Sequence, residues 1–123
     1  MPSGISKTKR IKVYIKTGGR CAYCGSWIAP CNFHVEHSVP KISGGSNRLQ
    51  NLLPSCAPCN HSKGYKTLEE FRVWTRVKHI AGLPFTLKQI EFLEETGCLD
   101  LIAGPAGIRR PFYFEEIGLE VES

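Results

Sequence analysis

The chain has 123 residues, of which 41% are hydrophobic, so it can bury one modest core and is too apolar for a disordered protein. No apolar run approaches the about 20 residues that span a bilayer, and we expect no membrane partner. The net charge of +5 is uneven: residues 1–65 carry nine Lys or Arg and one acid, whereas residues 66–123 carry seven and ten. The basic half favours a polyanionic partner, through counterion release and steering.

The N-terminal half alternates short predicted elements with turns. Residues 11–15 alternate in polarity, which is typical of a strand or of a short helix. Two glycines end this segment, and residues 21–25 are expected to form a tight knuckle-like turn. Residues 33–39 are predicted to form a strand that ends at Pro40. The start of the chain has no apolar secretory stretch, which favours a cytoplasmic protein.

A polar loop at 43–47 is expected to lead into a second strand around residues 52–54. A helix is predicted to begin near Cys56 and to run into Lys63. Further along, two capping boxes, at residues 67–70 and 86–89, predict two more helices that end near Gly82 and Gly97. The first of these helices has apolar residues at three-residue spacing: Leu68, Phe71, Trp74 and Val77.

Four cysteines are arranged as two Cys-x-x-Cys pairs, Cys21/Cys24 and Cys56/Cys59. Two intervening residues let a tight turn present both sulfurs to one ion, and four thiolates complete a tetrahedral zinc site. Cytoplasmic cysteine pairs are more often metal ligands than disulfides. We therefore expect a structural Zn²⁺, with an iron site or two pairs of free thiols as alternatives. The other two cysteines, Cys31 and Cys98, are expected to be small buried apolar residues.

The segment between the two cysteine pairs contains residues suited to phosphodiester hydrolysis. Hydrolysis requires a base that activates water and an electrophile that neutralises charge on the phosphate. His37 is the natural base, since imidazole titrates near neutral pH. Glu36 is the only acid in the basic half, and a lone carboxylate there is suited to hold Mg²⁺ or Mn²⁺.

Four separate elements resemble the HNH endonucleases of the ββα-metal (His-Me finger) superfamily. They occur in the order of the family and lie between residues 18 and 65: His34-Val35-Glu36-His37, Gly44-Gly45-Ser46-Asn47, Asn51-Leu52-Leu53, and Cys56 to Gly64. The resemblance implies two antiparallel strands, a long connecting loop and a helix, with the active site in the groove between them. In family members with cysteines, the two knuckles hold zinc beneath that site.

The resemblance also implies a role for each matching residue. His37 would be the general base, and Glu36 a ligand of the catalytic metal, where the family more often has Asp. Asn51 would brace the loop and orient the base. Asn60 would be the second metal ligand, through its side-chain carbonyl oxygen.

Several other residues are candidates for contact with substrate. His34 would share a strand face with Glu36, whereas Glu36 and His37 would point to opposite faces unless the strand bends near Pro40. His61 follows Asn60 and is a possible alternative metal ligand. Phosphate contacts are expected from five basic side chains: Arg20, Lys41, Arg48, Lys63 and Lys66.

The sequence therefore predicts an α+β protein with a ββα-metal core, a four-cysteine zinc site and additional C-terminal helices. The expected parts are a basic segment at 1–17, the nuclease core at 18–66, and a helical extension at 67–123 packed on the core. The expected function is metal-dependent cleavage of DNA, one strand per active site, by a monomer or homodimer in the cytoplasm of a bacterium or of a phage host.

Two alternatives stay open for the function. A zinc-stabilised module could bind nucleic acid without cutting it, or the chain could be an interaction protein that acts through its acidic helical half. RNA also stays open as the substrate, because composition does not separate the two polymers.

Overall fold

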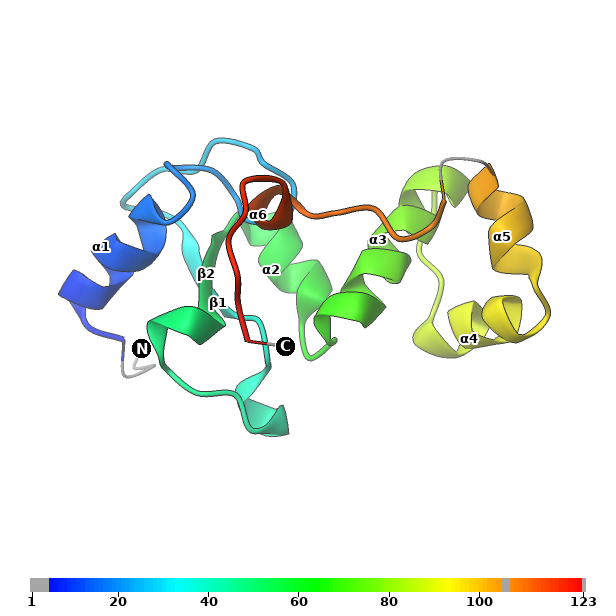
Figure 1. The fold of residues 1–123 in the computed structure, drawn as a ribbon, viewed down its shortest axis with the longest axis horizontal. Coiled ribbons are helices and arrows are strands. Elements are labelled where there is room, and N and C mark those ends of the chain that lie inside the picture. Colours follow the sequence, from blue (N-terminus) through cyan, green and yellow to red (C-terminus); the bar gives the residue numbers. More distant parts are fainter. Residues whose placement is uncertain (1–4, 105–106, 123) are drawn as a thin grey trace. The chain divides into compact units, whose positions relative to one another are not determined.

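The chain divides into two units. The computed structural model describes residues 5–104 and 107–122. Residues 5–67 and 112–122 form one unit, the N-terminal unit, and residues 68–111 form the other, the helical unit. The expected mixture of helices and a small sheet is confirmed (Figure 1). Residues 1–4, on which the expectation about a secretory signal partly rested, lie outside the described residues.

The N-terminal unit begins with a helix, α1 (Lys7–Ile15), so the helical alternative for residues 11–15 is the correct one. The Ser6 side chain caps α1 by accepting a hydrogen bond of 3.1 Å from the Lys9 backbone N–H. Val13 is the buried residue of α1 and packs with Phe33 and Leu52 in the core of this unit.

A two-stranded antiparallel sheet follows, formed by β1 (His34–His37) and β2 (Leu52–Ser55). The register pairs His34 with Ser55 and His37 with Leu52. The connection between the strands contains two short 3₁₀ turns, η1 (Lys41–Ser43) and η2 (Leu49–Asn51). The sequence-predicted strands are thus both present, and each is short.

The helix α2 (Ala57–Lys63) begins directly after β2, with Cys56 at its N-cap position. Proline in the first turn suits this start, because the first N–H groups of a helix have no partner within it. The helix contacts β1, so the order strand, strand, helix brings α2 beside the first strand of the hairpin.

The tail returns to the N-terminal unit as α6 (Tyr113–Glu116), which the sequence did not predict. The backbone N–H groups of Tyr113 and Phe114 donate to the carbonyls of Tyr23 and Ala22, at 3.2 and 2.8 Å. The aromatic rings of Tyr23 and Phe112 meet edge to face, with centroids 5.0 Å apart. The aromatic cluster of the tail therefore covers the first cysteine knuckle.

The helical unit contains α3 (Leu68–Ala81), α4 (Leu87–Glu95) and α5 (Cys98–Ala103). The capping box predicted at residues 86–89 is confirmed: the Thr86 side chain accepts from the Gln89 N–H, and the Gln89 side chain accepts from the Thr86 N–H. The apolar faces of the helices meet in one core, made of Val73, Val77, Ile90, Leu99, Ala103 and Ile108. Among the described residues, no helix has the length and apolarity needed to cross a membrane.

Candidate functional site

The four cysteines of the two Cys-x-x-Cys pairs lie together in the N-terminal unit. Their sulfur atoms are all within 4.8 Å of one another, and Cys24 Sγ lies 3.8 Å from Cys56 Sγ. Sulfurs that coordinate one zinc tetrahedrally at about 2.3 Å are about 3.8 Å apart, so this donor set fits zinc. The predicted cluster is therefore confirmed, and it can hold a metal such as zinc.

Local backbone geometry explains how the first knuckle presents its sulfurs. Gly25 has a φ of 78°, and its N–H donates to the Cys21 carbonyl at 2.9 Å, which closes a tight turn. The Cys21 N–H donates to the Ser26 carbonyl at 2.7 Å.

The remaining cysteines lie elsewhere. Cys31 is exposed, so the expectation that it is buried is wrong, and Cys98 is half-buried in the helical unit.

The four thiols are too close to ionise independently. Hydrogen bonds from the Cys21 and Cys59 thiols lower the pKa of Cys24. The pKa of Cys59 is raised, because its thiol hydrogen-bonds to the sulfurs of Cys21 and Cys24 and because burial disfavours its thiolate. A divalent cation removes this competition, because it allows all four sulfurs to be thiolates at once.

Glu36 is a buried carboxylate in the middle of β1, with 6% of its surface exposed. Its Oε2 accepts a hydrogen bond of 2.7 Å from Asn60 Nδ2, and its Oε1 lies 3.3 Å from Lys63 Nζ. Burial raises the pKa of Glu36, and the nearby Lys63 ammonium opposes that rise. Two of the predicted site residues, Glu36 and Asn60, are thus in direct contact.

Lys63 is fully buried at the end of α2. Besides Glu36, its ammonium group donates to the His37 backbone carbonyl at 3.1 Å. This position does not favour the predicted phosphate contact, since the ammonium group would have to leave both partners to reach solvent. It does explain how a carboxylate can be buried here: the opposite charge compensates part of the cost of its desolvation.

His37 ends β1, and its imidazole Nε2 lies 2.8 Å from Asn47 Oδ1. Asn47 was not predicted as a site residue, although it belongs to the loop that carries the family resemblance. His37 and Glu36 both border one open groove of about 510 Å³, called the β1–α2 groove. Its lining consists of Val35, Glu36, His37, Pro40, Lys41, Ile42, Asn60, His61, Gly64 and Tyr65. Although neighbours in a strand, both residues therefore reach one cavity.

Asn51 is completely buried and holds the connecting loop closed. Its Oδ1 accepts from the Val39 N–H at 2.8 Å, and its Nδ2 donates to the carbonyls of Val39 and Ser46 at 3.1 and 2.8 Å. The loop residue Gly45 has no room for a side chain: a Cβ there would lie 1.7 Å from the Val39 carbonyl oxygen. Asn51 thus fixes the loop that carries Asn47, the partner of His37.

The other predicted contacts are spread over the N-terminal unit. Lys41 and His61 are exposed and line the β1–α2 groove, whereas His34 and Arg48 are exposed outside that lining. Arg20 is half-buried, with its guanidinium 3.9 Å from the centre of the Trp27 ring. The structure therefore brings Glu36, His37, Lys41, Asn60 and His61 together at one groove, and it does not bring the other basic residues there.

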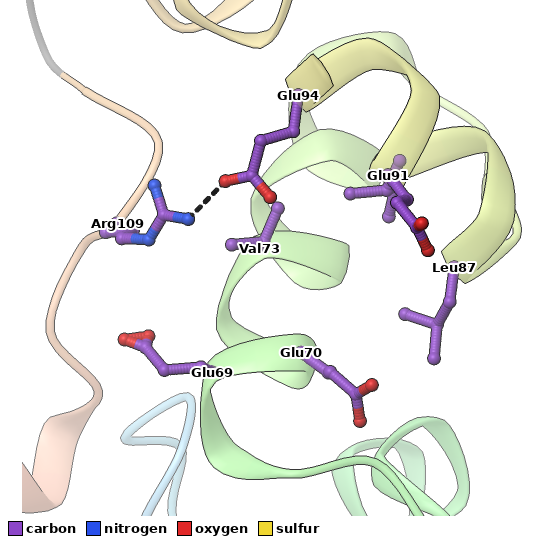
Figure 2. A pocket seen from close by; sticks show the side chains of 8 residues that line it. Glu69, Glu70, Val73, Leu87, Glu91, Glu94 and Arg109 are labelled. Atoms are coloured by element: carbon purple, nitrogen blue, oxygen red, sulfur yellow. Dashed lines mark hydrogen bonds and ion pairs between the residues drawn. The ribbon is translucent and has the colours of Figure 1, made fainter.

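The helical unit has a depression of its own, of about 240 Å³ (Figure 2). Figure 2 shows carboxylates around it, with one ion pair of 2.6 Å between Glu94 and Arg109. It is lined by Glu69, Glu70, Val73, Leu87, Ile90, Glu91, Glu94 and Arg109. Four carboxylates against one cation repel a polyanion, so the β1–α2 groove is the better candidate site.

Comparison with known proteins places the site in a family context. Residues 21–73 match the family described as HNH endonuclease. The chain is 40% identical over 65 residues to the CRISPR-associated endonuclease Cas9 of Corynebacterium diphtheriae, covering 52% of this chain and 6% of that protein. It is 38% identical over 60 residues to that of Actinomyces naeslundii, covering 48% and 5%. The chain thus spans only a small fraction of the length of these relatives.

A solved structure, that of the Type II-C Cas9 enzyme from Actinomyces naeslundii, is similar at a TM-score of 0.47 and 23% identity. The similarity covers 76% of this chain and 12% of that one.

Proposed function

We propose that this chain hydrolyses phosphodiester bonds in DNA at the β1–α2 groove, in a metal-dependent reaction, because residues 21–73 match the family described as HNH endonuclease. The observation that carries the proposal is the meeting of His37, Glu36 and Asn60 at that one groove. The order β1, β2, α2 supports assigning the core to the ββα-metal type. The four-cysteine cluster would hold a structural zinc that fixes the start of α2.

His37 is the proposed general base. The side-chain oxygen of Asn47 can only accept a hydrogen bond, so it holds a proton on Nε2 and leaves the lone pair on Nδ1. Nδ1 would then take a proton from the attacking water. Asn51, by closing the loop that carries Asn47, would keep the imidazole ring in one orientation.

Glu36 and Asn60 are the proposed ligands of a catalytic Mg²⁺ or Mn²⁺. Their side chains touch at 2.7 Å beside an open groove, and a carboxylate and an amide oxygen with room for water suit such ions. When bound, the ion would stabilise negative charge on the phosphate and on the departing 3′ oxygen. Asn60 must then turn its amide so that the oxygen, rather than Nδ2, faces the ion.

The charge distribution supports a nucleic-acid substrate. Residues 1–67 and 112–123 carry ten Lys or Arg and five acids, whereas residues 68–111 carry six of each. The whole net charge therefore belongs to the unit that contains the β1–α2 groove, and Lys41 is exposed in the lining of that groove. One such groove cuts one strand, so a monomer should nick duplex DNA, and a double-strand break requires two copies.

A plasmid-nicking assay tests this function. Zinc-loaded protein is incubated with supercoiled plasmid across a titration of Mg²⁺ and of Mn²⁺, with an RNA of similar length in parallel. Nicking should appear with metal and fall by about a hundredfold or more in His37→Ala, with zinc content unchanged. His79→Ala, which changes an exposed histidine of the helical unit, is the matched control and should cut like the wild type.

Two results would change the assignment. Wild-type protein that binds DNA and never nicks it with any metal would establish the alternative, a non-catalytic binding module. If the RNA is digested faster than the plasmid, RNA rather than DNA is the substrate.

A further inference from the structure

The segment that follows α6 runs along the loop between β1 and β2, and the red end of the ribbon in Figure 1 passes beside the hairpin. Glu122 makes the contacts. Its N–H donates to the Gln50 carbonyl at 3.0 Å, and its carbonyl oxygen lies 2.7 Å from Ser38 Oγ. Its carboxylate oxygens accept from Ser46 Oγ at 3.3 and 3.4 Å. One residue of the tail thus binds the loop at three separate places.

Each of these places is next to a residue of the proposed site. Ser38 follows His37, Ser46 precedes Asn47, and Gln50 precedes Asn51 in the chain. The contacts therefore bracket the base, the residue that holds its Nε2, and the asparagine that closes the loop.

The contact at Ser38 couples the tail directly to Asn51. Ser38 is buried, with 1% of its surface exposed, and its Oγ is 2.7 Å from both Asn51 Oδ1 and the Glu122 carbonyl oxygen. A hydroxyl has one proton, so it can donate to only one of these acceptors at a time. The tail and Asn51 consequently share one donor, and a change at Glu122 alters the hydrogen bonding of Asn51.

We propose that Glu122 is a positioning residue for the nuclease reaction: through Ser38, Ser46 and Gln50 it holds the loop that orients the imidazole of His37. This role rests on the proposed function. It gives a role in the reaction to Glu122, a residue of the tail that lies 84 positions after Ser38 in the sequence. Glu122 touches neither substrate nor metal in this role and acts only by restricting where the loop can lie.

The first test separates the contacts of the Glu122 side chain from those of its backbone. Glu122→Ala removes the contact to Ser46, and Glu122→Pro also removes the N–H that binds Gln50. Glu122→Gln keeps an acceptor oxygen for Ser46 and serves as the conservative rescue. Glu120→Ala removes an exposed carboxylate two residues away and is the control for charge.

Single-turnover nicking is measured at saturating DNA, and DNA affinity is measured separately in Ca²⁺. The nicking rate should fall by about threefold in Glu122→Ala and by about tenfold in Glu122→Pro, one hydrogen bond being lost at each step. DNA affinity should stay within about twofold in both, since the groove and its exposed cations are unchanged. Glu122→Gln and Glu120→Ala should nick at the wild-type rate.

A double-mutant cycle tests the route through Ser46. If the carboxylate acts through that hydroxyl, Ser46→Ala and Glu122→Ala combined should be no slower than the slower single variant. Additive losses would contradict this route.

A second readout does not depend on cutting. The ¹⁵N signals of the His37 ring should show one dominant tautomer in the wild type and exchange between two in Glu122→Pro, with the fold retained. Unchanged ring signals and unchanged nicking in Glu122→Pro would overturn the proposal. If the wild type never nicks, the proposed function fails, whereas a changed ring signal in Glu122→Pro would still establish that the tail positions His37.

Discussion

Removing the amide of Asn51 should destabilise the N-terminal unit strongly. In Asn51→Ala, the buried amide that bonds the Val39 N–H and the carbonyls of Val39 and Ser46 is lost. These three backbone groups are partly buried. The loss of the hydrogen bond to each should therefore cost about 1 kcal/mol, the lower end of the range for an unsatisfied buried group. We expect the free energy of unfolding to fall by about 3 kcal/mol.

The measurement must report on the N-terminal unit alone, since the chain has two units, each with a core of its own. Urea unfolding of zinc-loaded protein, followed through the methyl NMR signals of Val13 and Leu52, meets this need because both are buried in the core of that unit. Asn32→Ala, at an exposed asparagine of the same unit, is the matched control and should shift stability by less than about 0.5 kcal/mol.

Asn51→Asp gives a second comparison. This variant keeps the oxygen that accepts from the Val39 N–H, but it replaces the Nδ2 donor with a carboxylate oxygen. That oxygen would face the carbonyl oxygens of Val39 and Ser46 and would repel both, so Asn51→Asp should be at least as destabilising as Asn51→Ala. An Asn51→Ala protein as stable as the Asn32→Ala control would refute the reasoning, because the loop would then be held by something other than this amide.

Three further predictions concern the same unit. Gly45→Ala should cost more than Gly44→Ala, by about 1 kcal/mol or more in the same urea assay. At Gly45 the new Cβ would lie 1.7 Å from the Val39 carbonyl oxygen, whereas at Gly44 nothing lies within 4 Å and the cost is the strain of a φ of 94°. Equal stabilities would contradict the close approach. Cys56→Ser, or removal of zinc by a chelator, should unfold the N-terminal unit, as judged by loss of dispersed NMR signals. A folded, zinc-free protein would show that the cluster is dispensable. Burial raises the pKa of Glu36, so its stabilising contribution is present below its ordinary pKa and is lost as pH rises through the raised value. The stability of wild type relative to Glu36→Gln should therefore fall as pH rises above about 4, the ordinary pKa of a glutamate, in magnesium-free buffer, and a rise would contradict the direction of the shift.

Features with a local physical cause were predictable from the sequence. The Cys-x-x-Cys spacing predicted the sulfur cluster, because a tight turn brings two such side chains to one point wherever it occurs. The pattern around Thr86 predicted the start of α4, since a capping box needs only the four residues that form it. The adjacency of Glu36 and His37, together with the order of the four family motifs, predicted that both serve one site; the structure brings both to the β1–α2 groove, and their part in the chemistry stays a prediction.

The partners of those residues were decided by the tertiary structure. Glu36 meets Asn60 across 24 positions, and Ser38 meets Glu122 across 84. Lys63 carries the same charge whether it faces solvent or a buried carboxylate, so charge pattern alone could not separate the two positions. Periodicity and ligand spacing depend on neighbours within a few residues, whereas a hydrogen bond between distant residues depends on how every intervening element packs.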